Sequence, residues 1–358
     1  MRKVVVITLS WMLIGLLITV YDHLLLVSEL GGGYARDQTF WINLVFNLSA
    51  AFMGGILGSL WLVTYVNEKG RENSYGFNLA LVALSFFTIV LFITVVLTLI
   101  FIKYDTGSWP FSNATSTTEF WNNLRNPFHL KNVLVWGGVV MLTQLGLQVN
   151  DKFGQGLLLA FINGKYHRPK EEERIFMFVD LISSTSIAEQ LGNERYYKLL
   201  RDFFADITDS IIYNRGNIYQ YVGDEVVVSW TCDSSSDRQD FLYCFFAMRA
   251  KISQREVHYH NTYGLVPDFK AAVHYGSVTA GEIGIIKRDL TFSGDVLNTA
   301  ARILTFCKEY DRHLLISEKL KAYIGQNDGS FLFEKMGTKL LRGKSEKTEI
   351  YSVIPAIS

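Results

Sequence analysis

Cysteine and proline are both scarce in this chain of 358 residues, which holds three cysteines and five prolines. Cys232, Cys244 and Cys307 lie far apart, form no CxxC pair and have no histidine at metal-ligand spacing. This pattern argues against a disulfide framework and is typical of reduced thiols in a cytosolic domain. A net charge is missing as well, because 34 Lys and Arg balance 34 Asp and Glu. The balance gives no support to a nucleic-acid partner or an acidic tail.

Charged residues are few in the first 165 positions, where long apolar runs replace them. A helix needs about 20 mostly apolar residues to cross a hydrocarbon core of about 30 Å. The runs that qualify are residues 4–27, 41–66, 77–102 and 133–149. They predict an all-α, four-helix transmembrane domain over residues 1–149. A signal peptide is the alternative for the first run, but its length and the lack of a clear small-residue cleavage site favour an uncleaved anchor.

Basic residues near the ends of these spans indicate their orientation. Four spans place both termini on one side of the membrane. Basic residues flank that side at positions 2, 3, 69, 71, 152, 165, 168 and 170, and the other side at 36, 103, 125 and 131. Cytoplasmic loops carry such an excess. We therefore expect a multi-pass protein of the inner (plasma) membrane, with the C-terminal half and both termini in the cytoplasm.

Amide side chains interrupt the apolar runs at Asn43, Asn47, Gln144 and Gln148. Polar groups inside a membrane domain can line a ligand pocket or an ion path. They can also hydrogen-bond from one helix to the next, which is the commoner use. The sequence favours the second interpretation and leaves the first one open.

The second half of the chain alternates short apolar strands with amphipathic helices. Residues 150–170 are expected to form a coupling linker that ends near Pro169, and residues 171–358 a separate domain. Strands are predicted at 175–181, 217–222, 226–230, 269–274, 277–281, 314–316 and 348–353, and helices at 185–191, 194–213, 241–259 and 295–308. The two strands at 269–281 are expected to pair around Gly276. The order β-α-β-β-α-β with additions predicts an α/β (α+β) ferredoxin-like fold.

Two aspartates follow predicted strands of this domain. Asp180 comes after a buried strand, and Asp224 lies in a hairpin turn behind Gly223. Taken singly, they could be a helix cap and a turn residue. As a pair at adjacent strand ends they could bind hard cations such as Mg²⁺, which prefer oxygen ligands. The N–H groups that open the next helix, from Ser183, suit a phosphate. Together these features suit phosphoryl transfer with two metal ions.

Five short motifs then occur in a fixed order. They are FVDLISST at 178–185, YVGDE at 221–225, AVHYGSV at 272–278, GDVLNTAAR at 294–302 and LRGKSE at 341–346. They resemble the motifs of class III adenylyl and guanylyl cyclases, and the fourth is close to the family's G-D-x-V-N-x-A-x-R signature. The resemblance covers about residues 175–354 and implies a class III cyclase catalytic domain. The membrane half resembles only the general class of anchored bacterial cyclases.

The resemblance assigns a role to particular residues. Asp180, Asp224 and the backbone carbonyl of Leu181 would hold two divalent cations, Mg²⁺ or Mn²⁺. Asn298 would orient the ribose, and Arg302, one helical turn later, would stabilise charge on the α-phosphate. The residues that would contact the phosphates are Ser183, Ser184, Thr185, Arg342 and Lys344. In this family the metal-binding Asp pair comes from one subunit, and the base-reading residues and the Arg come from the other, so a head-to-tail homodimer with shared active sites is implied.

The choice of base is predicted from two positions. Adenylyl cyclases usually carry Lys where this chain has Gln220, and Thr291 occupies the partner position, as in one bacterial adenylyl subgroup. Guanylyl cyclases would normally carry Glu and Cys there. The amide of Gln220 offers a donor and an acceptor, so it can serve adenine without strictly excluding guanine. We expect ATP as substrate and cyclic AMP as product, in intracellular signal transduction, with guanylate cyclase as the alternative.

Two other functions remain possible from the sequence. A diguanylate cyclase is suggested by residues 222–226, which faintly resemble a Gly-Gly-Asp-Glu-Phe loop, but such enzymes lack the Asn298 and Arg302 helix motif. An inactive nucleotide-binding membrane receptor is the non-enzymatic alternative. The presence of both aspartates together with Asn298 and Arg302 argues against such degeneration.

Overall fold

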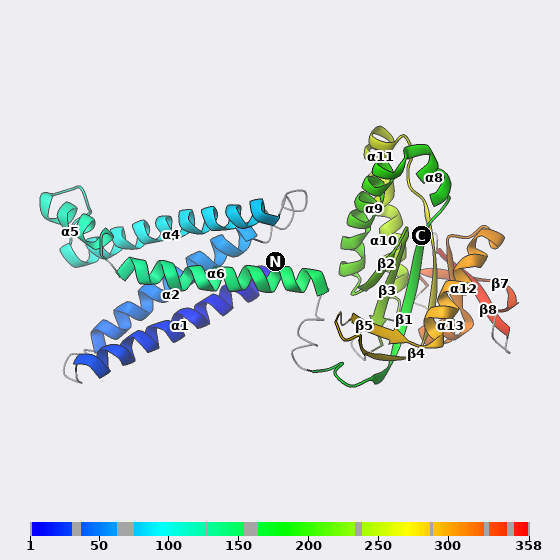
Figure 1. Ribbon diagram of the computed structural model, residues 1–358, viewed down its shortest axis with the longest axis horizontal. Helices are drawn as coiled ribbons and strands as arrows, with labels where there is room; N and C mark the ends of the chain where they lie inside the picture. Colours follow the sequence, from blue (N-terminus) through cyan, green and yellow to red (C-terminus); the bar gives the residue numbers. More distant parts are fainter. Residues whose placement is uncertain are drawn as a thin grey trace. The chain divides into compact units, whose positions relative to one another are not determined.

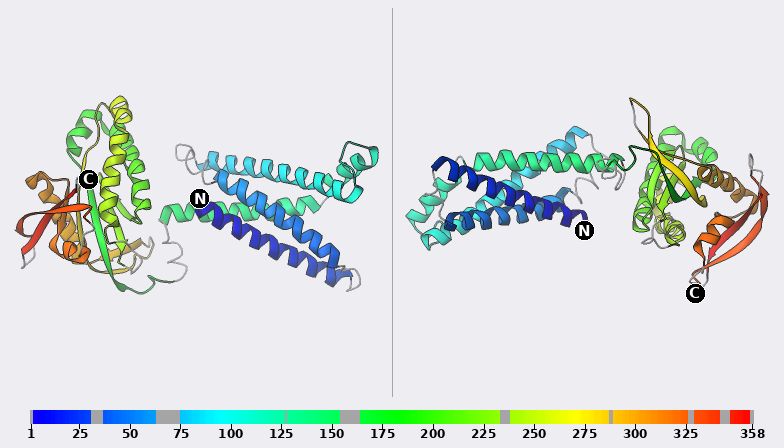
Figure 2. Two further views of the ribbon diagram at one scale, coloured as in Figure 1. Left: turned by 180° about the vertical axis from the view of Figure 1, so that it is seen from behind. Right: turned by 90° about the horizontal axis from the view of Figure 1, so that it is seen from below.

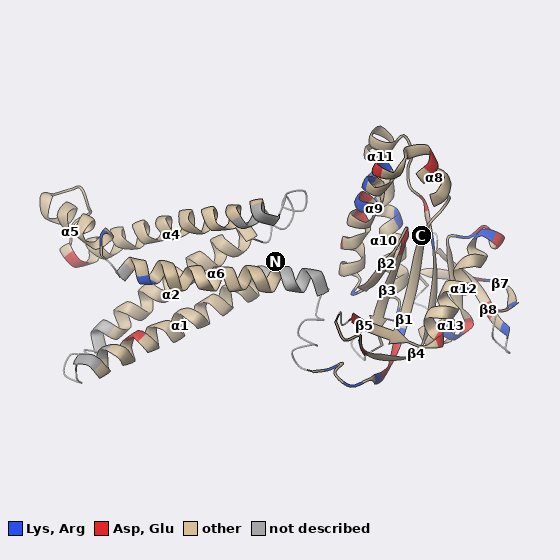
Figure 3. Ribbon diagram, viewed as in Figure 1, with Lys and Arg blue, Asp and Glu red and all other residues tan. Residues whose placement is uncertain are grey.

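The computed structural model describes residues 2–30, 37–62, 75–126, 128–153, 164–232, 238–286, 289–325, 329–341 and 347–356. The chain divides into two compact units, Met1–Val149 and Asn150–Ser358. Figure 1 shows that the first unit is helical and that the second contains the sheet. Lys, Arg, Asp and Glu are sparse in the described part of the first unit and frequent in the second (Figure 3).

The first unit is built from long apolar helices that lie alongside one another (Figures 1 and 2). Its helices are α1 (Arg2–Leu30), α2 (Asp37–Leu60), α4 (Tyr75–Thr106), α5 (Ala114–Leu124) and α6 (Phe128–Phe153). Four contain a stretch long and apolar enough to cross a membrane, namely Val4–Leu25, Phe40–Leu60, Ala80–Thr106 and His129–Leu147. The four long helices expected from the sequence are therefore present.

Helix α5 was not expected. It begins at a capped end, because the Asn113 side chain accepts a hydrogen bond of 2.8 Å from the backbone N–H of Ser116. Elsewhere in this unit, small residues bring α1 and α2 close together. A Cβ added at Gly55 would lie 3.0 Å from the Cα of Thr8, so only glycine fits there without displacement.

The second unit is a mixed sheet covered by helices on both faces. Its strands are β1 (Lys170–Leu181), β2 (Asn217–Val222), β3 (Glu225–Thr231), β4 (Phe269–Ile283), β5 (Asp289–Ser293), β6 (Leu314–Ser317), β7 (Phe331–Leu340) and β8 (Lys347–Pro355). Its helices are α8 (Ser184–Leu191), α9 (Asn193–Tyr213), α10 (Asp240–Gln254), α11 (Glu256–Tyr263), α12 (Asp295–Tyr310) and α13 (Glu318–Ile324). The strand order is β2-β3-β1-β4-β6-β8-β7, with β5 on β4.

The ferredoxin-like prediction is confirmed by this topology. Strand β1 lies between β3 and β4 and is antiparallel to both, and β2 pairs with β3. With α9 and α10 as the crossovers, the segments from β1 to β4 form the β-α-β-β-α-β order.

Strand β1 is buried on both faces, which explains its nearly continuous apolar sequence. Ile175, Met177 and Val179 pack with α9 and α10. Phe176 and Phe178 point to the other face and pack with α12. By the same alternation, Asp180 lies on the α12 side, at the end of the strand.

One strand prediction is wrong. The segments 269–274 and 277–281 do not form a hairpin around Gly276, because both belong to the continuous strand β4, whose hairpin partner is β5. Gly276 does not form a turn; it lets a helix pack closely against the strand. A Cβ at this position would come within 2.8 Å of Val296 Cγ2 on α12, so the glycine leaves room for that helix.

The predicted helix at 241–259 is also wrong in its extent, because α10 and α11 meet at Arg255. Arg255 Nε and the hydroxyl of Tyr259 donate to Asp206 of α9, at 3.2 and 2.7 Å. These tertiary bonds accompany the break. Strands β5 and β7 and helix α13 were not foreseen, because each is short or has little periodicity.

Candidate active site

Two acidic residues meet at one edge of the sheet. Asp180 faces Glu225 in the β1–β3 ladder and Lys270 in the β1–β4 ladder. Asp224 belongs to the two-residue turn between the paired residues Val222 and Glu225. The turn is possible because Gly223 adopts a positive φ of 65°. The fold therefore brings Asp180 and Asp224 together, as the sequence predicted.

The charge at this edge is predominantly negative. Burial raises the pKa of Asp180, the neighbouring Lys270 acts in the opposite direction, and repulsion from Asp224 raises the pKa further. Burial, with repulsion from Asp180 and Asp224, raises the pKa of Glu225 to about 7. The ammonium of Lys270 lies 3.2 Å from Asp180 Oδ2. Three carboxylates lie around one ammonium group, so ionisation of all three carboxylates requires additional positive charge nearby.

A divalent cation fits this donor set. No group of three or more His, Cys, Asp and Glu side chains is arranged to hold a metal in the described parts of the chain. Mg²⁺ does not need such a group, because it is commonly held by one or two carboxylates together with water and substrate phosphates. Lys270 at Asp180 shows that a cation is accommodated beside this carboxylate.

The chain beyond Asp180 turns into α8. Leu181 is buried and pairs with Phe269, and no contact of the described residues shows where its carbonyl would meet a metal. Ser183 adopts a left-handed φ of 59° and makes no side-chain cap to α8, which Ser184 and Thr185 begin. The first N–H groups of a helix have no partner inside it, so this end suits an anionic ligand.

Sequence reasoning missed three residues of the site. Tyr196 of α9 has its pKa raised by burial and by Asp224, and it hydrogen-bonds with Ser184. Lys270 and Glu225 are neighbours of Asp180 through strand register alone. Glu225 could have been found from its place beside Asp224. Nothing in the sequence indicates the pairing of Lys270.

Asn298 lies on the exposed side of α12, and Arg302, one helical turn later, is half-buried. Val296, Thr299 and Ile303 turn inward and are buried, whereas Asn298 is exposed. Among the described residues, no ion pair or hydrogen bond joins Arg302 or Asn298 to Asp180 or Asp224.

The position of Asn298 along the sheet separates it from the aspartates. Val296 lies against Gly276, which pairs with Arg174, six residues before Asp180 on β1. At about 3.3 Å per residue this distance is about 20 Å along the strand. One chain therefore does not bring Asn298 to its own aspartate pair.

The two predicted base-binding residues come from strands that are not neighbours in the sheet. Gln220 is exposed on β2, and Thr291 of β5 pairs with Gly281 of β4. Their chain neighbours touch, since the backbone N–H of Phe292 donates to the Tyr219 hydroxyl at 3.4 Å. No hydrogen bond links Gln220 with Thr291 in the part of the chain that the structure describes. Arg342 and Lys344 lie outside the described residues.

Comparisons with known proteins agree with this geometry. A family model for the adenylate and guanylate cyclase catalytic domain matches residues 167–354. Adenylate cyclase 2 of Rhizobium meliloti (strain 1021) is 33% identical over 207 residues, which are 58% of this chain and 57% of that protein. The adenylate cyclase of Anabaena cylindrica is 25% identical over 49% of this chain and 36% of its own length. The chain thus spans little more than half of the one relative and about a third of the other.

Solved structures share the fold. A bacterial light-regulated adenylyl cyclase superposes with a TM-score of 0.52 at 22% identity, covering 61% of this chain and 64% of its own. A second structure of a bacterial light-regulated adenylyl cyclase gives a TM-score of 0.51 at 21% identity, covering 62% and 64%.

Proposed function

This chain belongs to the adenylate and guanylate cyclase catalytic domain family, and from that premise we propose that it is a membrane-bound adenylate cyclase. It converts ATP to 3′,5′-cyclic AMP and pyrophosphate for intracellular signalling. The observation that carries the proposal is the meeting of Asp180 and Asp224 at the sheet edge where α8 begins. The family match supports this chemistry over that of a diguanylate cyclase.

The cation-binding residues in this proposal are Asp180, Asp224 and the carbonyl of Leu181. Two Mg²⁺ or Mn²⁺ ions held there would lower the pKa of the ribose 3′-hydroxyl and would neutralise charge on the pyrophosphate. Ser183, Ser184 and Thr185 at the start of α8 hold the phosphates through backbone N–H groups. Lys270 keeps the carboxylate of Asp180 in place between turnovers.

The remaining catalytic groups come from a second copy of the chain. Asn298 orients the ribose, and Arg302 stabilises charge on the α-phosphate. The exposure of Asn298 on α12, and its separation from the aspartates of its own chain, support a homodimer in which each active site is shared. Arg342 and Lys344 are proposed to bind the terminal phosphates.

Adenine is the proposed base. The residues next to Gln220 and Thr291 in the chain, Tyr219 and Phe292, touch, which supports a common location for the two predicted base-binding residues. Guanylate cyclase is the second candidate, because the amide of Gln220 offers hydrogen bonds to either purine.

Parallel assays of purified full-length protein with ATP and GTP, each with Mn²⁺ or Mg²⁺, test the proposal. Cyclic AMP with little cyclic GMP is the expected result. Cyclic GMP as the main product would overturn the base assignment and leave the mechanism in place. No product from either nucleotide would point to an inactive nucleotide-binding receptor.

The membrane half is proposed to anchor the enzyme in the inner membrane, with the catalytic unit and both termini in the cytoplasm. Four helices of sufficient length and apolarity support this arrangement. Protease added to sealed inside-out vesicles should remove the catalytic unit, and protease outside intact spheroplasts should not.

A further inference from the structure

The helices of the first unit border a partly open cavity of about 430 Å³. Residues of α1, α2, α4 and α6 line it, together with Asn123 at the end of α5. Sites for small-molecule ligands usually measure about 300–1,000 Å³ and combine apolar walls with a few polar groups. The size of this cavity is in the range for a small ligand.

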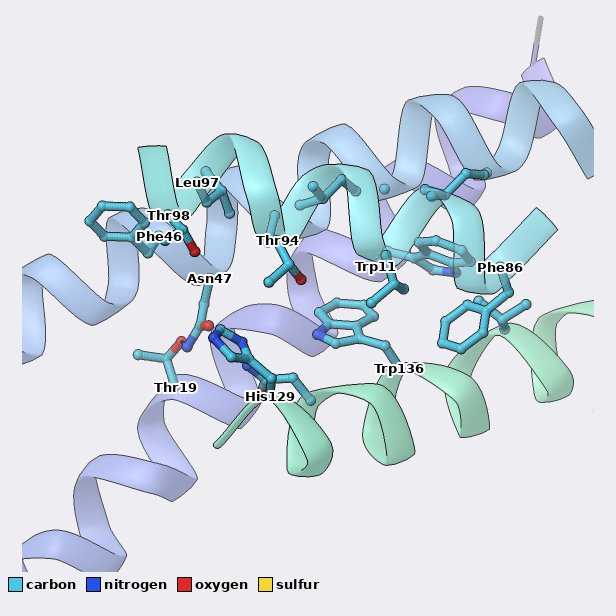
Figure 4. Close-up of a pocket in the computed structure, with 18 of the residues that line it drawn as sticks. Trp11, Thr19, Phe46, Asn47, Phe86, Thr94, Leu97, Thr98, His129 and Trp136 are labelled. Carbon is cyan, nitrogen blue, oxygen red and sulfur yellow. Dashed lines mark hydrogen bonds between the residues drawn. The ribbon is translucent and has the colours of Figure 1, made fainter. Parts of the chain in front are cut away.

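The two ends of the cavity differ in chemistry. One end is aromatic and aliphatic, with the ring centroids of Trp11 and Trp136 6.1 Å apart and Phe86 beside them (Figure 4). The other end is more polar, because Figure 4 places Thr19, Asn47, Thr98 and His129 there, although Phe46 and Leu97 lie among them. Further polar residues of the lining are Asp22, His23, Asn43, Ser85, Thr94, Asn123 and Asn132. The cavity is therefore amphipathic along its length.

Hydrogen bonds organise the polar end. The Asn47 amide donates to the Thr19 hydroxyl at 2.9 Å. His129 Nε2 lies 2.9 Å from the backbone oxygen of Asn123. An asparagine side chain offers two donors and two acceptor lone pairs, so these bonds leave capacity for a ligand. Helix-to-helix bonding accounts for the contact of Asn47 with Thr19, but not for the open volume beside it.

The charges at the polar end compensate each other. Asp22 forms an ion pair with Lys131 of α6. Because this ion pair has no net charge, the polar end of the cavity can offer a ligand hydrogen bonds but no opposite charge. It is therefore suited to an uncharged head group.

The length of the cavity suits a ligand with one hydrocarbon chain. Trp11 and Thr19 are eight residues apart on α1, which corresponds to about 12 Å along the helix axis. Dry cavities are apolar, and polar ones hold a partner for their polar groups. Water could serve the polar end alone, whereas a molecule with a hydroxyl or amide head and an apolar body matches both ends.

We propose that the membrane unit binds a neutral amphiphile in this cavity. Its hydroxyl or amide head lies at Asn47 and His129, and its aliphatic or aromatic body lies among Trp11, Phe86 and Trp136. The ligand has one of two sources with the same chemistry, a neutral lipid of the bilayer or a membrane-permeant solute. The assignment concerns binding and does not depend on the cyclase reaction.

Photolabelling of the full-length protein in phosphatidylcholine nanodiscs tests the site. The probe is a decanol that carries a diazirine near its tail, and labelled residues are identified by mass spectrometry. Saturable labelling at the apolar end, around Trp11, Phe86 and Val140, is expected, with loss of the label when unlabelled 1-decanol is in excess. Labelling that is confined to lipid-facing residues, or that 1-decanol does not compete, would overturn the proposal.

Two adjacent positions of α4 provide a matched pair of variants. Val90 lines the cavity, whereas the side chain of Leu91 is 61% exposed. Val90→Phe fills the cavity and should reduce the competable labelling at least about tenfold. Leu91→Phe should leave it within about twofold. Equal labelling of the two variants would contradict the site.

A third variant tests the head group, even if Val90→Phe does not assemble. Asn47→Leu keeps the volume and removes the amide, so competition by 1-decanol should weaken several-fold while competition by decane is unchanged. An equal loss for both competitors would overturn the assignment of the polar end. Decanoate or decyltrimethylammonium competing better than 1-decanol would contradict the neutral ligand.

Lipid extraction distinguishes the two sources. A neutral lipid that co-purifies from native membranes with Leu91→Phe protein, and not with Val90→Phe protein, identifies a bilayer ligand. Binding of 1-decanol with no co-purifying lipid identifies a solute. Either result supports the site.

Discussion

The carboxylate of Asp180 is the residue on which most of the proposed chemistry depends. Asp180→Asn keeps the size of the side chain and removes the charge that a cation needs. A metal supplies several kcal/mol to such a reaction, so cyclic AMP formation should fall at least about 100-fold. Turnover by purified protein measures this loss. The exposed Glu171 provides the control Glu171→Gln, which should keep normal turnover.

Glu225 makes the stability of the catalytic unit depend on pH. Its folded-state pKa is raised to about 7 from an ordinary 4.5, mainly by burial. Between these values the folded state binds more protons than the unfolded state, so stability falls as pH rises through that window. Glu225→Gln should therefore stabilise the metal-free catalytic unit at pH 8, by about 1–2 kcal/mol after screening is allowed for.

Hydrogen exchange in β1 and β3, measured in the presence of a chelator, reports this difference. The stabilising effect of Glu225→Gln should disappear below about pH 3.5, where the wild-type residue is protonated in both the folded and the unfolded state. An effect of equal size at both pH values would contradict the explanation.

At the scale of elements, the lack of a side chain at Gly276 allows α12 to pack closely against β4. An added Cβ would lie 2.8 Å from Val296 Cγ2, on the helix that carries Asn298 and Arg302. Gly276→Ala should cost about 1–3 kcal/mol through overpacking, and it should lower the rate of cyclisation by moving the helix. Gly138→Ala is the control, since its Cβ would meet nothing within 4 Å. Equal activity of the two variants would show that α12 tolerates the shift.

The start of β1 is held by a buried charge cluster. Arg174 donates to Glu172, to the Ser229 hydroxyl and to the Tyr166 hydroxyl, and its guanidinium lies 4.4 Å from the Phe292 ring centroid. Arg174→Ala removes the ion-pair partner of Glu172, which keeps a 3.5 Å hydrogen bond from the Tyr166 hydroxyl, and should destabilise the catalytic unit by about 3–5 kcal/mol. Hydrogen exchange of β1 peptides measures the loss. Replacing both Arg174 and Glu172 by Met should restore most of the stability, because no buried charge then remains.

At the scale of the whole molecule, the shared active site predicts complementation. Asp180→Asn chains and Arg302→Ala chains should each be inactive alone. When the two variants are co-expressed in equal amounts, half of the dimers contain one chain of each kind. Each of these mixed dimers has one intact active site of two. About a quarter of wild-type cyclic AMP formation is therefore expected. Activity that stays at the level of the single variants would rule out sites built from two chains.

The sequence by itself determined the features that depend on neighbouring residues. Apolar length predicted the four long helices, and the continuous run at 175–181 predicted a strand buried on both faces. The motif around Asp224 predicted a turn, which Gly223 permits through its positive φ. Each of these properties is local, because helix and strand periodicity act over a few residues.

Only the tertiary structure decided which distant residues meet. Lys270 reaches Asp180 because the β1–β4 register pairs them, and Gly276 lies within a continuous strand at the point where α12 packs over it. The cavity of the first unit arises where residues of separate helices, such as Trp11, Phe86 and Trp136, leave space between them. Register and packing depend on contacts far apart in the chain, so no local pattern contains them.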